Sequence, residues 1–592
     1  MKTSLLLLVT LLASCTCQEA SDPPVPAAAP LPQHADIIVL VTVDTLRSDF
    51  VSFGGYAQPT TPYVDALTEK GTWFSHAFSP SSWTAPSMAS LFTGVYPTTH
   101  GVQTGGKDLE TGEVVVPILS EPLETLAESL QAAGYRTIGT PSNRLLAKDR
   151  GFAQGFDTYP DKAPFIEANK VNAIVRRQLK AAYGDTWKTS WKNDKVFLWI
   201  HYYDPHLPWP PHPKLAPKFA PDFNGSLDTF PIDQNAKQLA KRFPDPDAED
   251  VRRFRAMYAQ DVRYFDEQFK ILSTELGLDD PNVALFITSD HGEEIFEHGD
   301  LSHGNTLFDD QVHVPMLLRV PGGPAGQVIE RPVSTVDLMP TLLGQLGIPA
   351  PEDAQGVDRL APDAPAVDAT FIEYPTYDSS AQKAWVEGPF KYLWDPLYQT
   401  EALYDFVADP AESVDVKDQH PEVVARAREA LREFRLAHLS AGRFHLRVRG
   451  TKGQRLQLRV STDDLFDANF ITRPALAPDA FEMDLDRSYL ALDTVLENDR
   501  LELRCWCRGS DLRVEATLDG EPLNGLTLAP GSEARPLPAD FDRGELPERR
   551  AEDLGWPGRG QAWMWLEAGA SEALPVVNTP EEADRLKELG YR

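Results

Sequence analysis

Cysteine is scarce in this chain, with four among 592 residues. Cys15 and Cys17 belong to the N-terminal leader, whereas Cys505 and Cys507 share one face of a predicted strand with Leu501 and Leu503. We interpret this second pair as buried thiols. A metal site of the Cys-x-Cys type is the alternative, but no histidine or further cysteine pair accompanies it.

Positive charge is also in short supply. Lysine and arginine together number 56 against 88 aspartates and glutamates, so the formal net charge is −32. A field of this sign repels polyanions and argues against nucleic acid as a partner. An anionic substrate must therefore meet a local cluster of metal and cationic groups.

Long apolar runs are missing too. The stretch from Leu5 to Ala13 follows Lys2, as in an export signal, and it is too short to cross a bilayer. The sequence LASC at residues 12–15 resembles a bacterial lipobox, which would make Cys15 a lipidated N-terminus. Ordinary signal cleavage near the same point is the alternative.

The leader and the segment after it predict an exported protein. Residues 1–17 are assigned to the signal and lipobox, and residues 18–34, rich in proline and alanine, to a tether. The expected location is the bacterial envelope, in the periplasm or at the cell surface. Membrane contact is expected only through the lipid anchor.

The chain is too long for one ordinary domain. Across residues 35–349 strands and helices alternate, which predicts an α/β fold with a mostly parallel central sheet flanked by helices. Continuous apolar runs at 37–41, 196–200 and 283–287 predict its buried strands, and a stripe over 251–276 predicts a core helix.

Two further regions follow this main domain. Residues 350–440 are predicted to form a subdomain with short strands and a helix over 421–438. Residues 441–592 alternate apolar and polar residues, with a hairpin turn at Asp519-Gly520, and predict a β-rich, sandwich-like module.

Polar residues follow each of the three apolar runs. Asp44 follows the first, a segment from His201 through Asp204 to His206 the second, and Asp290-His291 the third. In open α/β sheets ligands bind at the carboxyl ends of the strands. Taken singly, each residue has a structural reading as a helix cap or a surface histidine, but together they favour a site.

The donor set indicates the metal. Mixed carboxylate and imidazole ligands favour zinc, manganese or iron over calcium or magnesium as the divalent cation.

Thr84 is the candidate nucleophile. It precedes a predicted helix that has Pro86 in its first turn and ends at Gly94. The free amides and the dipole of a helix N-terminus stabilise an alkoxide or a bound oxyanion. The alternative is that Thr84 only caps the helix.

Taken in order, these motifs resemble the sulfatase family of the alkaline phosphatase superfamily. The similar segments span roughly residues 36–440 and do not include the β-rich module. They are 44–47, 86–87, 93–97, 100–101, 134–137, 204–206, 289–293, 314–315, 337–343, 388–392 and 403–410.

The resemblance implies a role for each matching residue. Asp44, Asp290 and His291 would hold the metal, and the oxygen of Thr84 would complete its coordination. His206 would act as general acid or as a donor to the ester.

The substrate side of the site is implied in the same way. His303 stands where many sulfatases have a lysine that contacts the sulfate. Asn143, His201 and Asp204 are assigned to substrate binding.

Two departures from the family pattern bear on the chemistry. Sulfatases convert a cysteine or serine to formylglycine, whereas this chain has Thr84 there and Met88 in place of the supporting arginine. Threonine cannot give that aldehyde because its β-carbon carries a methyl group. Thr45 replaces an aspartate of calcium sulfatases, which again favours a transition metal.

These departures favour phosphoester hydrolysis or phosphoryl-group transfer through Thr84. Sulfate-ester hydrolysis without formylglycine is the second hypothesis, and a non-catalytic, anchored binding protein is the third. The expected substrate is a small-molecule, glycan-linked or lipid-linked anionic ester. The sequence does not assign an oligomeric state.

Overall fold

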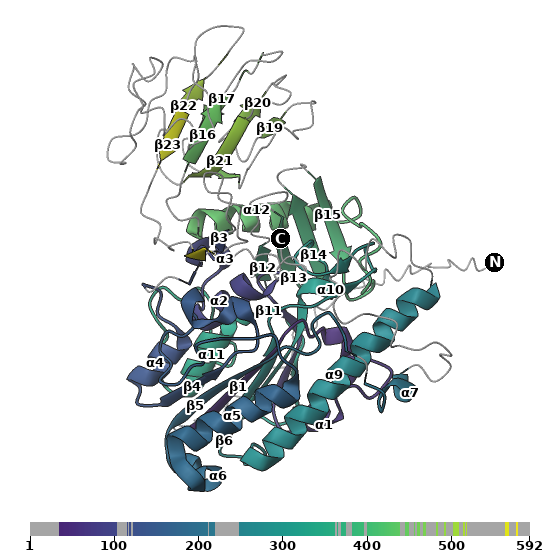
Figure 1. The fold of residues 1–592 in the computed structure, drawn as a ribbon. Coiled ribbons are helices and arrows are strands. Elements are labelled where there is room, and N and C mark those ends of the chain that lie inside the picture. Colours follow the sequence, from purple (N-terminus) through teal and green to yellow (C-terminus); the bar gives the residue numbers. More distant parts are fainter. Residues whose placement is uncertain are drawn as a thin grey trace, which may run out of the picture.

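The computed structural model describes residues 35–438 except 103–114, 117, 120–121, 211, 220–247, 362–363, 365–368, 374–381 and 396–399. Beyond residue 438 it describes short strands and three single residues (Figure 1). The predicted leader and tether, residues 1–34, lie outside the described residues. Within the described part, no helix is both long enough and apolar enough to cross a membrane.

The central sheet is mostly parallel, as predicted. Its strands lie in the order β10-β2-β9-β6-β1-β5-β4, and β11 pairs with β2. Only the β2–β9 and β6–β9 pairs are antiparallel. The bounds are β1 Ile37–Val43, β2 Thr72–Phe78, β4 Arg136–Thr140, β5 Val196–Tyr202, β6 Val283–Ser289, β9 His313–Arg319, β10 Gln327–Ile329 and β11 Val333–Ser334.

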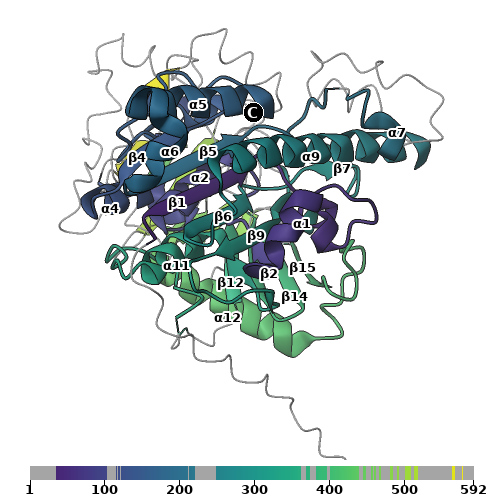
Figure 2. The same cartoon turned by 90° about the horizontal axis from the view of Figure 1, so that it is seen from below.

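Helices cover both faces of this sheet (Figure 2). In β1, alternate residues from Ile37 to Val43 pack in the core with helices α5 and α9, while Ile38 and Leu40 pack with α2, α4 and α11. Burial on both faces explains why this strand is apolar throughout its first five residues. The bounds are α2 Thr84–Thr93, α4 Leu126–Ala132, α5 Ala168–Tyr183, α9 Ala248–Leu276 and α11 Leu338–Gln345.

The long α9 confirms the core helix predicted from the apolar stripe. The remaining helices of the main domain are short. They are α1 Pro62–Thr68, α3 Pro97–His100, α6 Trp187–Ser190, α7 Ala216–Phe219 and α10 Asp309–Val312, and the two-residue strands β7 Glu294–Ile295 and β8 Leu301–Ser302 pair with each other.

A second, antiparallel sheet follows with the order β12-β13-β14-β15. Helix α12, Pro421–His438, packs on β13 and β14 through Val423, Ala427 and Leu431, and its bounds agree with the sequence prediction. The strands are β12 Ala369–Glu373, β13 Lys383–Glu387, β14 Phe390–Asp395 and β15 Thr400–Asp405.

Beyond α12 the described residues form strands only, in agreement with the predicted β-rich region. Two four-stranded antiparallel sheets have the orders β18-β21-β16-β23 and β19-β20-β17-β22. Cys505 and Cys507 lie in β21, but the state of their side chains and the predicted turn at Asp519-Gly520 lie outside the described residues.

The strands of this region are short, and one pairs back to the main domain: β24 with β3. The bounds are β3 Val115–Val116, β16 Phe444–Val448, β17 Arg459–Ser461, β18 Phe466–Ala468, β19 Phe481–Met483, β20 Leu490–Leu492, β21 Leu501–Cys507, β22 Arg513–Glu515, β23 Trp563–Leu566 and β24 Val576–Val577.

Candidate active site

Three neighbouring strands bring the site together. β1 pairs in parallel with both β5 and β6, so the carboxyl ends of all three meet at one edge of the sheet. Asp44 directly follows β1, Asp290 directly follows β6, and His201 is the last but one residue of β5. The sheet therefore sets the spacing of these side chains before any of them forms a contact.

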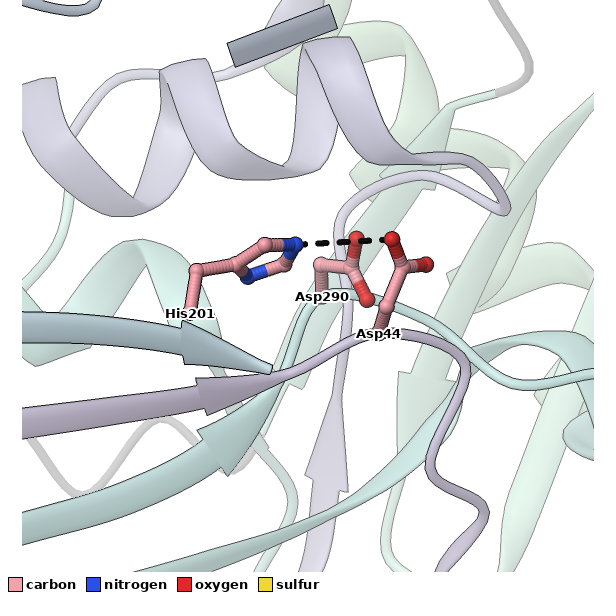
Figure 3. Close-up of side chains that lie close together, drawn as sticks. All are labelled: Asp44, His201 and Asp290. Atoms are coloured by element: carbon pink, nitrogen blue, oxygen red, sulfur yellow. Dashed lines mark ion pairs between the residues drawn. The ribbon is translucent and has the colours of Figure 1, made fainter. Parts of the chain in front are cut away.

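Asp44, His201 and Asp290 form a group that can bind a metal ion (Figure 3). One ligand atom from each lies within 4.8 Å of the others, and all three residues are buried. Asp44 Oδ1, Asp290 Oδ2 and His201 Nε2 have no hydrogen-bond partner in the described part of the chain. Buried carboxylate oxygens without a partner are costly unless a cation pairs with them, so the group fits a divalent metal.

Hydrogen bonds leave one oxygen of each carboxylate for such a cation. Asp290 Oδ1 accepts from the backbone N–H groups of Thr45 (3.1 Å) and His291 (2.9 Å). Asp44 Oδ2 accepts from Asn143 Nδ2 at 2.7 Å. Thr45 has φ of 56°, in the left-handed region that a threonine rarely occupies, and this turn carries its N–H to Asp290.

His291 and Thr84 lie beside the same carboxylates. His291 Nε2 is 3.7 Å from Asp44 Oδ1, 3.5 Å from Asp290 Oδ2 and 3.2 Å from Thr84 Oγ1. The structure thus brings together all four residues that the resemblance implied as metal ligands. It adds His201, which the sequence had assigned to substrate binding.

Thr84 is the first residue of helix α2 rather than its cap. The cap position belongs to Trp83, and no side chain caps this helix terminus. The alternative that Thr84 serves only as a helix cap is therefore wrong. The Thr84 hydroxyl is fully buried. Its Oγ1 contacts His291 Nε2 and lies 3.4 Å from Asn143 Nδ2.

Burial dominates the electrostatics of the group. It raises the pKa of Asp44 to about 7 and, with the Asp44 charge, the pKa of Asp290 to about 8. It lowers the pKa of His201 to about 4 and that of His291 well below its usual value. These two carboxyls have raised pKa values and these two imidazoles have lowered ones, so the four groups contain no cation of their own, and a bound metal ion would supply one.

Two more histidines and a glutamate line the site. The His303 ring lies 4.4 Å from that of His291 and 4.8 Å from that of His206, between centroids. Its Nδ1 is 2.8 Å from Glu293 Oε1, and this carboxylate outweighs burial and raises the pKa of His303. Glu293 was given no role from the sequence, although it belongs to the same short motif as Asp290 and His291.

His206 has a different protonation state. Its Nδ1 contacts the carbonyl oxygen of Leu207, which only accepts, so the proton of the neutral ring is on Nδ1 and Nε2 has none. Burial lowers the pKa of His206 to about 3. In this state the ring accepts a proton and does not donate one from Nε2.

Asp204 and His298 make other contacts. Asp204 Oδ2 accepts from the N–H of Ala168 at the start of α5, and burial followed by the charge of Asp261 raises its pKa. A contact between Asp204 and substrate stays a prediction. The His298 ring stacks on Phe308 at 3.5 Å.

A family model described as Sulfatase matches residues 36–348, more than half of the chain. The chain belongs to the sulfatase family. Among curated proteins it is similar to the uncharacterized sulfatase YidJ of Escherichia coli, with 25% identity over 446 residues that cover 67% of this chain and 86% of that protein.

Solved structures of this sulfatase fold are similar as well. A 2-O GAG sulfatase gives a TM-score of 0.54 at 17% identity, covering 68% of this chain and 92% of its own. The phosphonate monoester hydrolase of Agrobacterium radiobacter gives 0.52 at 21% identity, covering 68% and 96%. The predicted fold and the prediction of an enzyme are confirmed: the chain is an ester hydrolase of the sulfatase family.

Proposed function

We propose that this sulfatase-family hydrolase cleaves phosphate esters, or transfers their phosphoryl group, with unmodified Thr84 as the nucleophile. Threonine cannot form the aldehyde that a formylglycine mechanism requires. At the position of the supporting arginine this chain has Met88, a residue of α2 whose side chain is fully buried in the apolar core. The side chain at this position therefore carries no positive charge.

One observation carries the proposal: the Thr84 hydroxyl lies at the amino end of α2 within the group of metal-binding atoms. Its Oγ1 lies 3.2 Å from His291 Nε2, and that nitrogen is 3.7 Å from Asp44 Oδ1 and 3.5 Å from Asp290 Oδ2. Backbone amides at a helix N-terminus stabilise negative charge on the attacking oxygen and on the transferred group. A divalent cation held by Asp44, Asp290 and His291 would lower the pKa of the hydroxyl and neutralise the oxygens of the substrate.

The residues of the chain divide the remaining work. Thr84 would lose its hydroxyl proton to solvent when the cation binds and attack as the alkoxide, so that its oxygen forms a bond to phosphorus as the bond from phosphorus to the leaving oxygen breaks. His303, held by Glu293, donates a proton to the leaving oxygen. A water molecule then attacks phosphorus and releases phosphate, Thr84 leaves as the alkoxide, and Nε2 of His206 accepts a proton of that water.

This division differs from the sequence-based prediction, which gave proton donation to His206. The ring contacts favour His303 instead, because its Nδ1 faces a carboxylate whereas that of His206 faces a carbonyl. A cationic imidazolium beside a carboxylate has a second N–H to donate.

Sulfate-ester hydrolysis through Thr84 is the second candidate function. It is favoured by the names of relatives, which include sulfatases and a 2-O GAG sulfatase, whereas the phosphonate monoester hydrolase supports phosphorus chemistry. A glycan-linked or lipid-linked anionic ester at the bacterial envelope remains our proposed substrate setting.

The test is a substrate panel on purified protein. Aryl sulfate, a phosphate monoester and a phosphate diester are assayed with zinc, manganese, iron, calcium and magnesium added singly. The proposal predicts the fastest turnover on a phosphate ester with one of the first three metals. Turnover confined to aryl sulfate would establish the second candidate instead.

A further inference from the structure

Two buried imidazoles face the same pair of carboxylates. His201 Nε2 lies 3.4 Å from Asp44 Oδ2, and His291 Nε2 lies 3.7 Å from Asp44 Oδ1 and 3.5 Å from Asp290 Oδ2. Distances alone allow either ring to bind a metal ion. Both rings are fully buried, and an imidazole that binds a metal or accepts a hydrogen bond is neutral, with one N–H and one lone pair. The partner of Nδ1 therefore decides what Nε2 can do.

For His291 the partner is a carbonyl. Its Nδ1 lies 2.9 Å from the backbone oxygen of Gly292, which only accepts hydrogen bonds. The proton must be on Nδ1, so Nε2 has a free lone pair. This lone pair faces the Thr84 hydroxyl and two carboxylate oxygens, and a metal ion at their centre could bind all four atoms.

For His201 the partner is a hydroxyl that is already an acceptor. Nδ1 lies 2.8 Å from Thr42 Oγ1, and this oxygen also receives the indole N–H of Trp199 at 2.9 Å. An indole nitrogen only donates. Among the described residues, His201 Nδ1 is the sole acceptor within reach of the Thr42 hydroxyl proton. Thr42 therefore donates to Nδ1, and the proton of His201 is on Nε2.

The three groups form a chain of donors inside the sheet. Thr42 and His201 are directly paired across β1 and β5, and Trp199 precedes His201 by two residues on the same face of β5. All three are fully buried, so water does not replace a missing partner. Reversing the chain would leave the hydroxyl proton of Thr42 without an acceptor in a dry environment, at about 1–3 kcal/mol. It would also turn the lone pair of His201 Nε2, in place of an N–H, toward the carboxylate oxygen of Asp44 at 3.4 Å, which is electrostatically unfavourable.

We propose that His201 is not a second nitrogen ligand beside His291 but presents an N–H to the carboxylate of Asp44, with Thr42 and Trp199 as positioning residues that fix this tautomer. The proposal rests on the metal centre proposed above. The Nε2–H of His201 then faces Asp44 Oδ2 at 3.4 Å, the oxygen that also accepts from the amide of Asn143 at 2.7 Å. Asp44 Oδ1 is left for the cation.

Metal binding tests the assignment without reference to turnover. Zinc or manganese affinity is measured by competition with a chelating indicator for the wild type, His201→Ala, His201→Gln and His291→Ala. We expect His291→Ala to lose at least about 100-fold in affinity and both His201 variants to change less than about threefold. A loss of tenfold or more in His201→Ala overturns the inference while the metal centre stands. Unchanged binding in His291→Ala overturns both.

A spectrum tests the tautomer itself. The ¹⁵N shifts of ring-labelled histidine, assigned by comparison with His201→Gln, report which nitrogen of His201 carries the proton. We expect Nε2–H in the wild type and loss of this preference in Thr42→Val. Thr288→Val is the matched control, because Thr288 pairs with Thr42 across β1 and β6 and its hydroxyl, among the residues that the structure describes, bonds only the Ser289 carbonyl. Nδ1–H in the wild-type protein contradicts the proposal.

Discussion

This chain has two groups of buried carboxylates, and they differ in whether a lysine side chain pairs with them. At the strand ends, Asp44 and Asp290 have one oxygen each without a hydrogen-bond partner among the described residues. Beside β14, the Lys391 ammonium lies 2.6 Å from both Asp309 and Glu412.

The pKa of Asp309 follows this difference. Burial acts on both groups, but Lys391 and His313 outweigh it and hold the pKa of Asp309 well below its usual range. The two carboxyls share the one ammonium unequally, because burial and the charge of Asp309 raise the pKa of Glu412 to about 7. At the strand ends burial has no such opponent and raises the pKa of Asp44 to about 7 and of Asp290 to about 8. Buried acids matched by a lysine are structural, whereas unmatched acids at a sheet edge mark a site for an external cation.

The largest effect is expected from Asp290→Asn. The substitution keeps an oxygen for the N–H groups of Thr45 and His291 and replaces the metal-facing oxygen with an amide nitrogen. We expect metal binding to be lost and turnover to fall about a thousandfold, equivalent to about 4 kcal/mol. Metal content and kcat/KM are measured on protein whose circular dichroism equals that of the wild type. Full metal content would place the cation elsewhere.

Lys391→Met tests the other side of the comparison. Removing the ammonium leaves two carboxylates facing each other in a buried space, which we expect to destabilise the fold by about 3 kcal/mol. Denaturant unfolding measures this change, and metal affinity of the folded protein should stay as in the wild type. Lys417→Met is the control, since Lys417 pairs with Asp415 near the surface and should contribute less than about 1 kcal/mol. Equal losses in the two variants would contradict a special role for the buried ammonium.

Glu293→Gln should have an intermediate effect. The variant keeps the shape of the side chain and an acceptor for His303 Nδ1 but removes the charge that favours the imidazolium. We expect kcat to fall about 30-fold, or about 2 kcal/mol, with little change in metal affinity. Glu294→Gln is the neighbouring control, because Glu294 accepts from the N–H groups of His298 and Asp300. A kcat within threefold of the wild type would remove the Glu293–His303 pair from the mechanism.

The smallest effect is a pH dependence of metal affinity. Asp44 and Asp290 have raised pKa values, so below about pH 7 a metal ion must displace their protons. Affinity should therefore rise between pH 6 and pH 8 and level off above that. The same shifts predict that the metal-free protein loses stability as pH rises from about 4 to about 8, because the folded state holds protons that the unfolded state releases. Titration with zinc and thermal unfolding at several pH values measure both trends, and flat curves would contradict the raised pKa values.

Apolar continuity and periodicity predicted the framework. The runs that became β1, β5 and β6 are buried on both sides, so every residue had to be apolar, and the α9 stripe reflects one face packed on that sheet. The polar residues just beyond those runs predicted the site, because parallel strands end at the same edge.

What the sequence could not supply is the direction of each hydrogen bond. His201, His206 and His291 cannot be told apart in the sequence. In the structure a hydroxyl contacts Nδ1 of His201, whereas a carbonyl contacts Nδ1 of His206 and of His291, so His201 has the other tautomer. The hydrogen bond of Thr42 to His201 could not be predicted for the same reason, although a threonine near the end of an apolar strand stands out in the sequence. Asp204 shows the reverse case, in which a polar residue at a strand end binds helix α5.

Thr84→Ala tests the central claim most directly. Turnover of the preferred phosphate ester is compared for the wild type, Thr84→Ala and Thr93→Ala, whose hydroxyl bonds the Ala89 carbonyl at the opposite end of the same helix. We predict that kcat/KM falls at least about a thousandfold in Thr84→Ala, with metal still bound, and stays within a few fold of wild type in Thr93→Ala. Wild-type turnover in Thr84→Ala would contradict a nucleophilic threonine.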